Sequence, residues 1–225
     1  MDQRHIFLVA LFISLLSLVA QCGANGNSTA AGHRLRGSNS SETHQAEVLR
    51  AKLAKLAAMG APIDFNQLAS LVFQWQNYAR QWPQAFASVL GGLCLGANSL
   101  QFLARQPAVP PLSWSDGMSR AAADLTNAAG PLGQVGHTGP DGSLPWDRVS
   151  KYGRWSSIVS ENISYGQEKG YLVICQFVND YGVPDFSHRL NMYDPTLTVT
   201  GISCGRHSVW GEMCTVEYAG GFAPF

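Results

Sequence analysis

The first half of the chain carries the apolar spacing of amphipathic helices. One helical run starts near residue 46 and stops at Gly60. A second run starts at Asp64, which together with Gln67 forms the residue pair of a capping box. It ends before Pro83, since proline cannot continue a helix. The apolar face of this second run consists of Leu68, Leu71, Val72, Trp75, Tyr78 and Ala79. We expect that face to belong to the core.

Shorter helices and three strands are predicted beyond Pro83. The helical segments are 83–90, 99–105, 115–130, 146–152 and 170–181, with an extended connector over 107–111. Ser115 caps one helix, and Pro145 takes the first turn of another. The strands are 157–165, 197–204 and 212–219, the last two joined by a loop over 205–211. This order predicts an α+β fold, a three-layer α/β/α sandwich with a small, mainly antiparallel sheet.

The N-terminus has the pattern of a secretory signal peptide. Arg4 precedes an apolar run over residues 6–20, which at about 15 residues is shorter than the roughly 20 that span a bilayer. Cleavage after Ala20 or Ala24 fits the small residues there, and an uncleaved anchor is the alternative. No second long apolar run follows, so we expect a secreted, extracellular protein without a stable membrane anchor.

The expected organisation has four parts. They are a signal peptide over 1–24, a flexible linker over 25–45, an N-terminal helical extension over 46–70 and the folded domain over 71–225. The linker is rich in Gly, Asn, Ser and Ala, a composition that buries little apolar surface. Basic and acidic residues balance at 15 each, so no basic face is available for a nucleic-acid partner.

Four of the five cysteines lie outside the leader. Cys204 and Cys214 fall on two strands that we expect to be adjacent, and they are predicted to form a disulfide. Cys94 and Cys175 lie in apolar helical surroundings. They form either a second disulfide or two small buried hydrophobic residues, and both alternatives stay open here.

Four polar segments combine a histidine or an acid with glycine or proline turns. They are 136–142, 161–166, 179–182 and 187–191. Functional side chains are commonly carried on loops that a rigid scaffold positions. Their order along the chain resembles the CAP superfamily (SCP/TAPS; cysteine-rich secretory, antigen 5 and pathogenesis-related proteins), in its microbial SCP-like extracellular branch. The resemblance covers roughly residues 71–222.

The resemblance implies an α/β/α sandwich whose cleft holds two histidines and two acids. On the matching positions these are His137, Glu161, Asp180 and His188. Many animal members carry a glutamate where this chain has Asp180, so its carboxylate would lie about one methylene further back. The four residues are the candidate site, with any catalytic role unknown.

Two neutral imidazoles can bind Zn²⁺ when water or a carboxylate completes the ligand set. We therefore expect His137 and His188 as metal ligands, with the carboxylates orienting the rings. Two protein ligands make an exchangeable site, so no cofactor is required, and zinc or another divalent cation is the candidate occupant. Alternatively, both histidines are hydrogen-bonded loop residues.

The expected function is a secreted CAP-type protein that binds a small apolar ligand, a sterol or fatty acid, and a divalent metal in this cleft. One alternative is a metal-assisted hydrolase or protease with the same four residues, although the sequence shows neither a nucleophile nor a third metal ligand. The other is a secreted effector that acts through a host or cell-surface protein.

Four residues near these motifs receive other interpretations. We expect His207 to face solvent or to take part in a turn, and Glu212 and Glu217 to lie on one face of the sheet. Asn162 belongs to an Asn-x-Ser sequon, but it is a doubtful glycan site because it lies inside the second polar segment.

Overall fold

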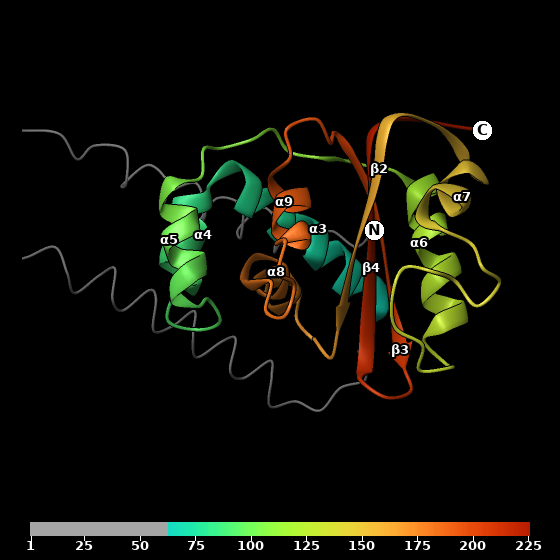
Figure 1. Cartoon of the computed structure of the whole chain (residues 1–225), viewed down its shortest axis with the longest axis horizontal. Helices are drawn as coiled ribbons and strands as arrows, with labels where there is room; N and C mark the ends of the chain where they lie inside the picture. The colour runs from blue at the N-terminus through green and yellow to red at the C-terminus, as the bar shows by residue number, and fades with distance from the viewer. Residues whose placement is uncertain (1–62) are drawn as a thin grey trace, which may run out of the picture. The chain divides into compact units, whose positions relative to one another are not determined.

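A four-stranded sheet organises residues 63–225, the part of the chain that the computed structural model describes (Figure 1). Its strands are β1 (Ser113–Trp114), β2 (Gly153–Tyr165), β3 (Val199–His207) and β4 (Gly211–Pro224). The order across the sheet is β1-β3-β4-β2. β4 pairs antiparallel with both β2 and β3, and only β1 pairs in parallel. β2 is therefore an edge strand.

Helices cover both faces of this sheet. α6 and α7 pack on one face, and α3, α8 and α9 pack on the other, with α4 and α5 beyond them (Figure 1). The bounds are α3 (Phe65–Gln81), α4 (Pro83–Leu90), α5 (Ala97–Arg105), α6 (Asp116–Ala129), α7 (Pro145–Ser150), α8 (Gly170–Asn179) and α9 (Ser187–Tyr193). The predicted α+β, three-layer fold is confirmed.

Local signals in the sequence set several helix ends. The Asp64 carboxylate accepts hydrogen bonds from the backbone N–H groups of Asn66 and Gln67, so it caps α3. Ser115 likewise accepts from the Met118 N–H and caps α6. The expected signal peptide, linker and most of the helical extension lie outside the described residues. α3 itself runs without a break across residues 70 and 71.

Four elements differ clearly from the sequence-based expectation. β4 ends at Pro224, five residues later than predicted. α9 was expected as part of a polar turn segment, and β1 was not expected at all. β2 begins four residues earlier than predicted and contains an irregularity between Ser156 and Val159. Each depends on contacts with other elements. α9 packs on α8 and β2, β1 exists through its pairing with β3, and the extensions of β2 and β4 pair with one another.

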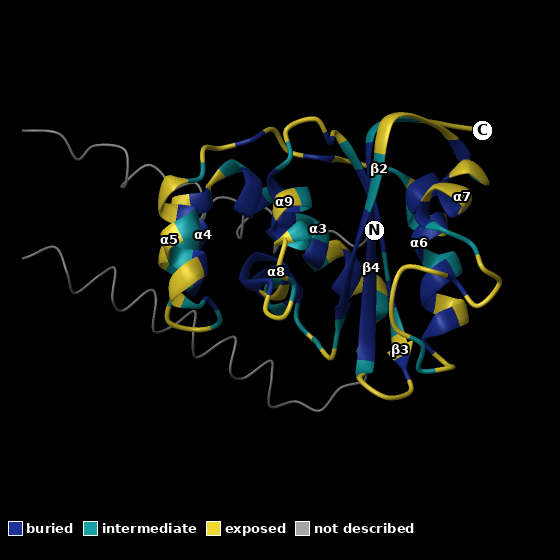
Figure 2. Cartoon of the chain, in the orientation of Figure 1, coloured by how far each residue is buried: buried dark blue, intermediate teal, exposed yellow. Residues whose placement is uncertain are grey.

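The core lies on both faces of β4, where every residue from Glu212 to Ala219 is buried (Figure 2). Side chains alternate along the strand. Thr215 receives a hydrogen bond from Thr126 of α6, while the Tyr218 hydroxyl donates to Gln76 of α3 on the opposite face. β4 is thus the strand whose two faces contact the two sets of helices.

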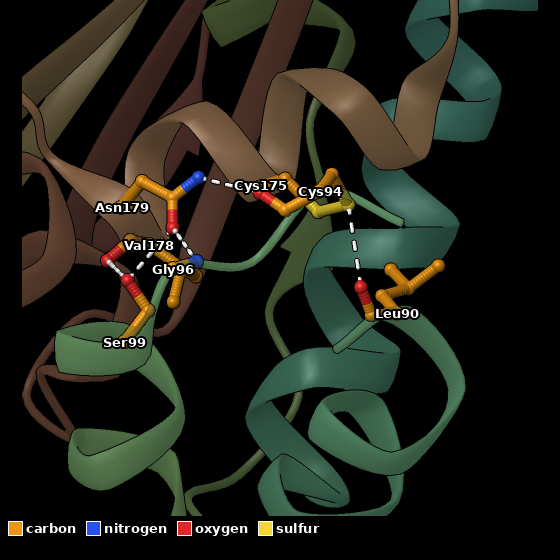
Figure 3. Close-up of a disulfide and its surroundings, with 7 residues drawn as sticks. All are labelled: Leu90, Cys94, Gly96, Ser99, Cys175, Val178 and Asn179. Carbon is orange, nitrogen blue, oxygen red and sulfur yellow. Dashed lines mark hydrogen bonds between the residues drawn. A yellow bond between two sulfur atoms is a disulfide. The ribbon is translucent and has the colours of Figure 1, made fainter. Parts of the chain in front are cut away.

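Two disulfides cross-link this unit. Cys204 and Cys214 are cross-strand partners on β3 and β4, and their predicted bridge is confirmed. Cys94 and Cys175 form the second bridge, which decides between the two alternatives left open by the sequence (Figure 3). No helix between residues 63 and 225 is long and apolar enough to cross a membrane.

Gly201 on β3 lies directly against the first turn of α6. A methyl group at this position would collide with the Ser119 nitrogen and with Met118. We predict that Gly201→Ala destabilises the protein by about 1–3 kcal/mol, because forcing extra volume into a packed interface shifts the backbone. Denaturant unfolding measures the loss. Gly92→Ala is the matched control, since its added methyl meets no atom within 4 Å. Equal stabilities of the two variants would contradict this account.

Candidate functional site

The candidate residues meet at a cleft beside the outer edge of β2. The cleft has a volume of about 270 Å³. His137 comes from the loop between α6 and α7, Asp180 follows α8, and His188 lies in α9. The lining residues are Gly136, His137, Ile163, Tyr165, Gln176, Asp180, Tyr181, Val183 and His188. The two histidines therefore reach one cleft from elements on opposite faces of the sheet.

His137 is held from behind by Glu161. Its Nδ1 lies 2.7 Å from Oε1 of Glu161, and the side chains are 51% and 1% exposed. An ionised carboxylate can only accept a hydrogen bond, so the ring proton resides on Nδ1. The Nε2 lone pair of His137 is then free for a ligand. Glu161 itself lies behind the cleft wall rather than in it.

His188 repeats this arrangement with Asp180. Nδ1 of His188 lies 2.7 Å from Oδ1 of Asp180, whose other oxygen accepts from the Arg189 backbone N–H at 2.9 Å. The His188 side chain is 21% exposed and the Asp180 side chain is buried. The shorter aspartate thus still reaches its imidazole. Asp180 adopts a left-handed conformation at the C-terminal cap of α8, with φ of 55°.

Arg148 fixes the loop that carries His137. Its guanidinium donates to the backbone carbonyls of His137 and Ser143 at 3.1 and 2.8 Å, and to Oε2 of Glu161 at 2.6 Å. The Gly136 N–H also donates to the Tyr165 hydroxyl at 3.0 Å. The His137 ring and its backbone are therefore both anchored to the sheet.

Asn162 fixes the backbone of His188 from β2. Its side-chain amide donates to the His188 carbonyl at 3.0 Å, and its oxygen accepts from Asn191 at 2.9 Å. Asn162 is completely buried. In the folded protein this side chain positions α9, and its amide nitrogen is not accessible for a glycan.

Asn179 fixes the end of α8 immediately before Asp180. Its side-chain oxygen accepts from the Gly96 N–H and from the Ser99 hydroxyl, and its amide donates to the Cys94 carbonyl (Figure 3). The Cys94–Cys175 disulfide joins the same two segments one helical turn earlier. The chain around Asp180 is thus attached to residues 94–99 at several points.

The structure tests the expectations for three neighbouring residues. His207 does not face solvent: it is 2% exposed, and its Nδ1 accepts from the N–H groups of Val209 and Trp210, so the turn alternative is the correct one. Glu212 and Glu217 are both buried, and five positions along a strand place them on opposite faces rather than on one.

Sequence reasoning missed Arg148 as a member of the site. In the sequence Arg148 is a lone arginine in a predicted short helix, which is no signal of a site. Its role depends on its hydrogen bond to Glu161, 13 positions further along the chain. Between residues 63 and 225, no group of three or more His, Cys, Asp or Glu side chains is arranged to hold a metal ion. The cleft instead offers two imidazoles, each oriented by its own carboxylate.

The sequence profile of the cysteine-rich secretory protein family, CAP, matches residues 66–218. This match covers more than half of the chain and the whole region that carries the cleft. The chain belongs to the CAP family. Among curated proteins, the search found no match.

Three solved structures resemble this fold. An extracellular protein containing a SCP domain from Bacillus anthracis shares 16% identity (TM-score 0.45), over 68% of this chain and 40% of that one. An outer surface protein from Borrelia burgdorferi shares 17% (TM-score 0.49), over 72% and 98%. A cysteine-rich secretory protein from Staphylococcus aureus shares 13% (TM-score 0.46), over 88% and 44%. This chain spans less than half of the first and third.

Arg148→Met tests the anchoring of the site. The substitution leaves the buried Glu161 carboxylate without its cation, and breaking such a pair costs about 3–5 kcal/mol. We expect a loss of unfolding free energy of that size in denaturant titrations. Arg154→Met, at an exposed position of β2, is the control and should stay within about 0.5 kcal/mol of the wild type. A similar small effect at Arg148 would show that the ion pair does not hold the site.

Proposed function

We propose that this chain is a secreted CAP-family binding protein whose cleft takes a small ligand with an apolar body, and holds a divalent cation exchangeably at His137 and His188. One observation carries the proposal. Each imidazole has its Nδ1 held by a buried carboxylate, so two Nε2 lone pairs are available to the same cleft.

The donor set fits an exchangeable zinc ion. Neutral imidazoles are preferred Zn²⁺ ligands, and a carboxylate bonded to the other ring nitrogen fixes the ring orientation and makes it a better ligand. Only two protein ligands are offered, so water or ligand atoms would fill the remaining positions. When bound, the cation would attract an oxygen atom of the ligand, and the two histidines would set where that oxygen lies.

The rest of the lining supports an apolar ligand. Ile163, Tyr165 and Val183 face the cleft beside the polar groups, and small-molecule sites typically combine a mainly apolar lining with a few oriented polar groups. About 270 Å³ is close to the lower end of the usual range of roughly 300–1,000 Å³. This volume suits a small molecule, or one end of a fatty acid or sterol.

A hydrolase is the second candidate, because an imidazole held by a carboxylate is the usual general base. The cleft lining contains no serine, threonine or cysteine, so water would have to be the nucleophile. Secretion is supported by the apolar leader and the two disulfides, which are typical of oxidising compartments.

Zinc calorimetry on the mature protein tests the metal site. We expect saturable binding that disappears in a His137→Ala/His188→Ala double variant, because both Nε2 ligands are then gone. Asp180→Asn, which keeps both ligands but removes the charge behind His188, should weaken binding about 10–100-fold. Glu168→Gln, which removes an exposed carboxylate outside the cleft lining, should bind like the wild type.

Zinc binding that survives the double variant would place the ion elsewhere and contradict the metal site. Circular dichroism of each variant checks folding. Loss of binding in a folded double variant would establish that the two imidazoles are required together.

Displacement of a fluorescent fatty acid tests the apolar part of the cleft separately. Val183→Lys places a charged side chain at the cleft wall and should lower the affinity at least about tenfold, since an ammonium group is costly to desolvate. Leu190→Lys is the matched control on α9. Leu190 is 60% exposed and does not line the cleft, so the Leu190→Lys variant should bind the fatty acid with the affinity of the wild type. Equal losses at both positions would place the ligand outside the cleft.

A further inference from the structure

Glu217 is a buried acid directly behind the site. It lies on the central strand β4 and pairs across the antiparallel ladder with Glu161 of β2. Side chains opposite one another in such a ladder share a face, with Cβ atoms about 4.5–5.5 Å apart. The Glu217 side chain is 0% exposed, so two buried carboxyl groups lie close together under the His137 loop.

One cation serves both acids. Arg148 Nη2 lies 2.6 Å from Glu161 and 3.7 Å from Glu217. Among residues 63–225, the charged groups that act on Glu217 are Arg148 of α7 and Glu161 of β2. β3, on the other side of β4, places Gly201 opposite Glu217 and contributes no side chain. With both acids ionised, the buried cluster would carry a net negative charge.

The hydrogen bonds decide which acid is the ionised one. Both oxygens of Glu161 have a hydrogen-bond partner: Oε1 contacts Nδ1 of His137, and Oε2 accepts from the Arg148 guanidinium, which can only donate. Neither oxygen of Glu217 has a hydrogen-bond partner among residues 63–225. Hydrogen bonds to the charged form of an acid favour that form, and a buried carboxylate without hydrogen bonds is strongly disfavoured.

We propose that the Glu161–Glu217 pair holds one proton in the folded protein, located on Glu217, and that this neutral acid is a positioning residue of the site. A neutral Glu217 leaves Arg148 to Glu161 alone, and Glu161 then holds the His137 ring in place. An ionised Glu217 would compete for the same guanidinium and loosen its bond to Glu161. The positioning role toward His137 rests on the function proposed above, whereas the proton on Glu217 does not.

The energetics agree with the geometry. Burial raises the pKa of Glu217 well above its usual value, and the negative charge of Glu161 raises the pKa further, while Arg148 opposes both effects. In the unfolded chain Glu217 loses its proton near the ordinary glutamate value of about 4.3. Folding at a pH between that value and the raised pKa therefore takes up a proton. The stability contributed by this group falls as the pH rises from that value toward the raised pKa.

Glu217→Gln tests the proposal, because glutamine resembles the neutral acid and needs no proton. We expect the stability of the variant relative to the wild type to rise with pH from the ordinary glutamate value of about 4.3 up to the raised pKa of Glu217. In the pH interval where Glu217 is protonated only in the folded state, the folding equilibrium constant of the variant divided by that of the wild type should rise about tenfold per pH unit. Glu168→Gln, at an exposed position, is the control, and its stability relative to the wild type should not rise about tenfold per pH unit over the same interval.

Carbon-13 NMR titration of the glutamate carboxyls in the wild type provides a second measurement that needs no variant to fold. One buried glutamate should remain protonated at pH 7. If every glutamate is ionised at pH 7, or if the variant loses relative stability as the pH rises, the proposal is overturned. Zinc calorimetry on the wild type reports separately on the cleft, so the two proposals can fail independently.

Discussion

The pairing of the buried Arg148 guanidinium with the Glu161 carboxylate is the interaction on which the candidate site depends. Both side chains are 1% exposed, so bulk solvent does not reach either charge and each depends on the other. Arg148 also donates to two carbonyls of the loop that carries His137. One side chain of α7 thereby orients the acid behind His137 and the backbone of His137 itself. A change at this pair would move the ring and its loop together.

The same solution recurs elsewhere in the domain. Arg80 of α3 is completely buried and donates to backbone carbonyls of Pro110, Met192, Asp194 and Leu197. Arg189 donates to the carbonyls of Val178 and Asn179 at the end of α8, directly before Asp180. Buried backbone carbonyls in irregular segments need donors, and a guanidinium supplies up to five. Three arginines thus take the role that regular hydrogen-bond ladders play in helices and strands.

The edge position of β2 explains how one cleft obtains side chains from both faces of the sheet. Odd-numbered residues of β2, such as Glu161 and Ile163, face α6 and α7, whereas Asn162 faces α9. An edge strand has no neighbour on its outer side, so loops from both layers can meet there. The two histidines are separated by 51 positions in the sequence, yet adjacent residues of β2 hold them. Glu161 contacts the His137 ring, and Asn162 donates to the His188 carbonyl.

The sequence by itself determined the layer architecture, the helix caps at Asp64 and Ser115 and the order of the polar motifs, because periodicity and capping are local properties. Only the tertiary structure decided the Cys94–Cys175 bridge, the short elements β1 and α9, and the burial of Glu217. A cysteine 81 positions from its partner has no local signal of pairing. Likewise, a glutamate in a strand has the same sequence pattern whether it faces water or, as Glu217 does, a buried arginine and a second acid. Removal of these side chains from water and the ion pairs between them arise only when distant elements pack. These two effects set the charge and the orientation of the groups in the candidate site.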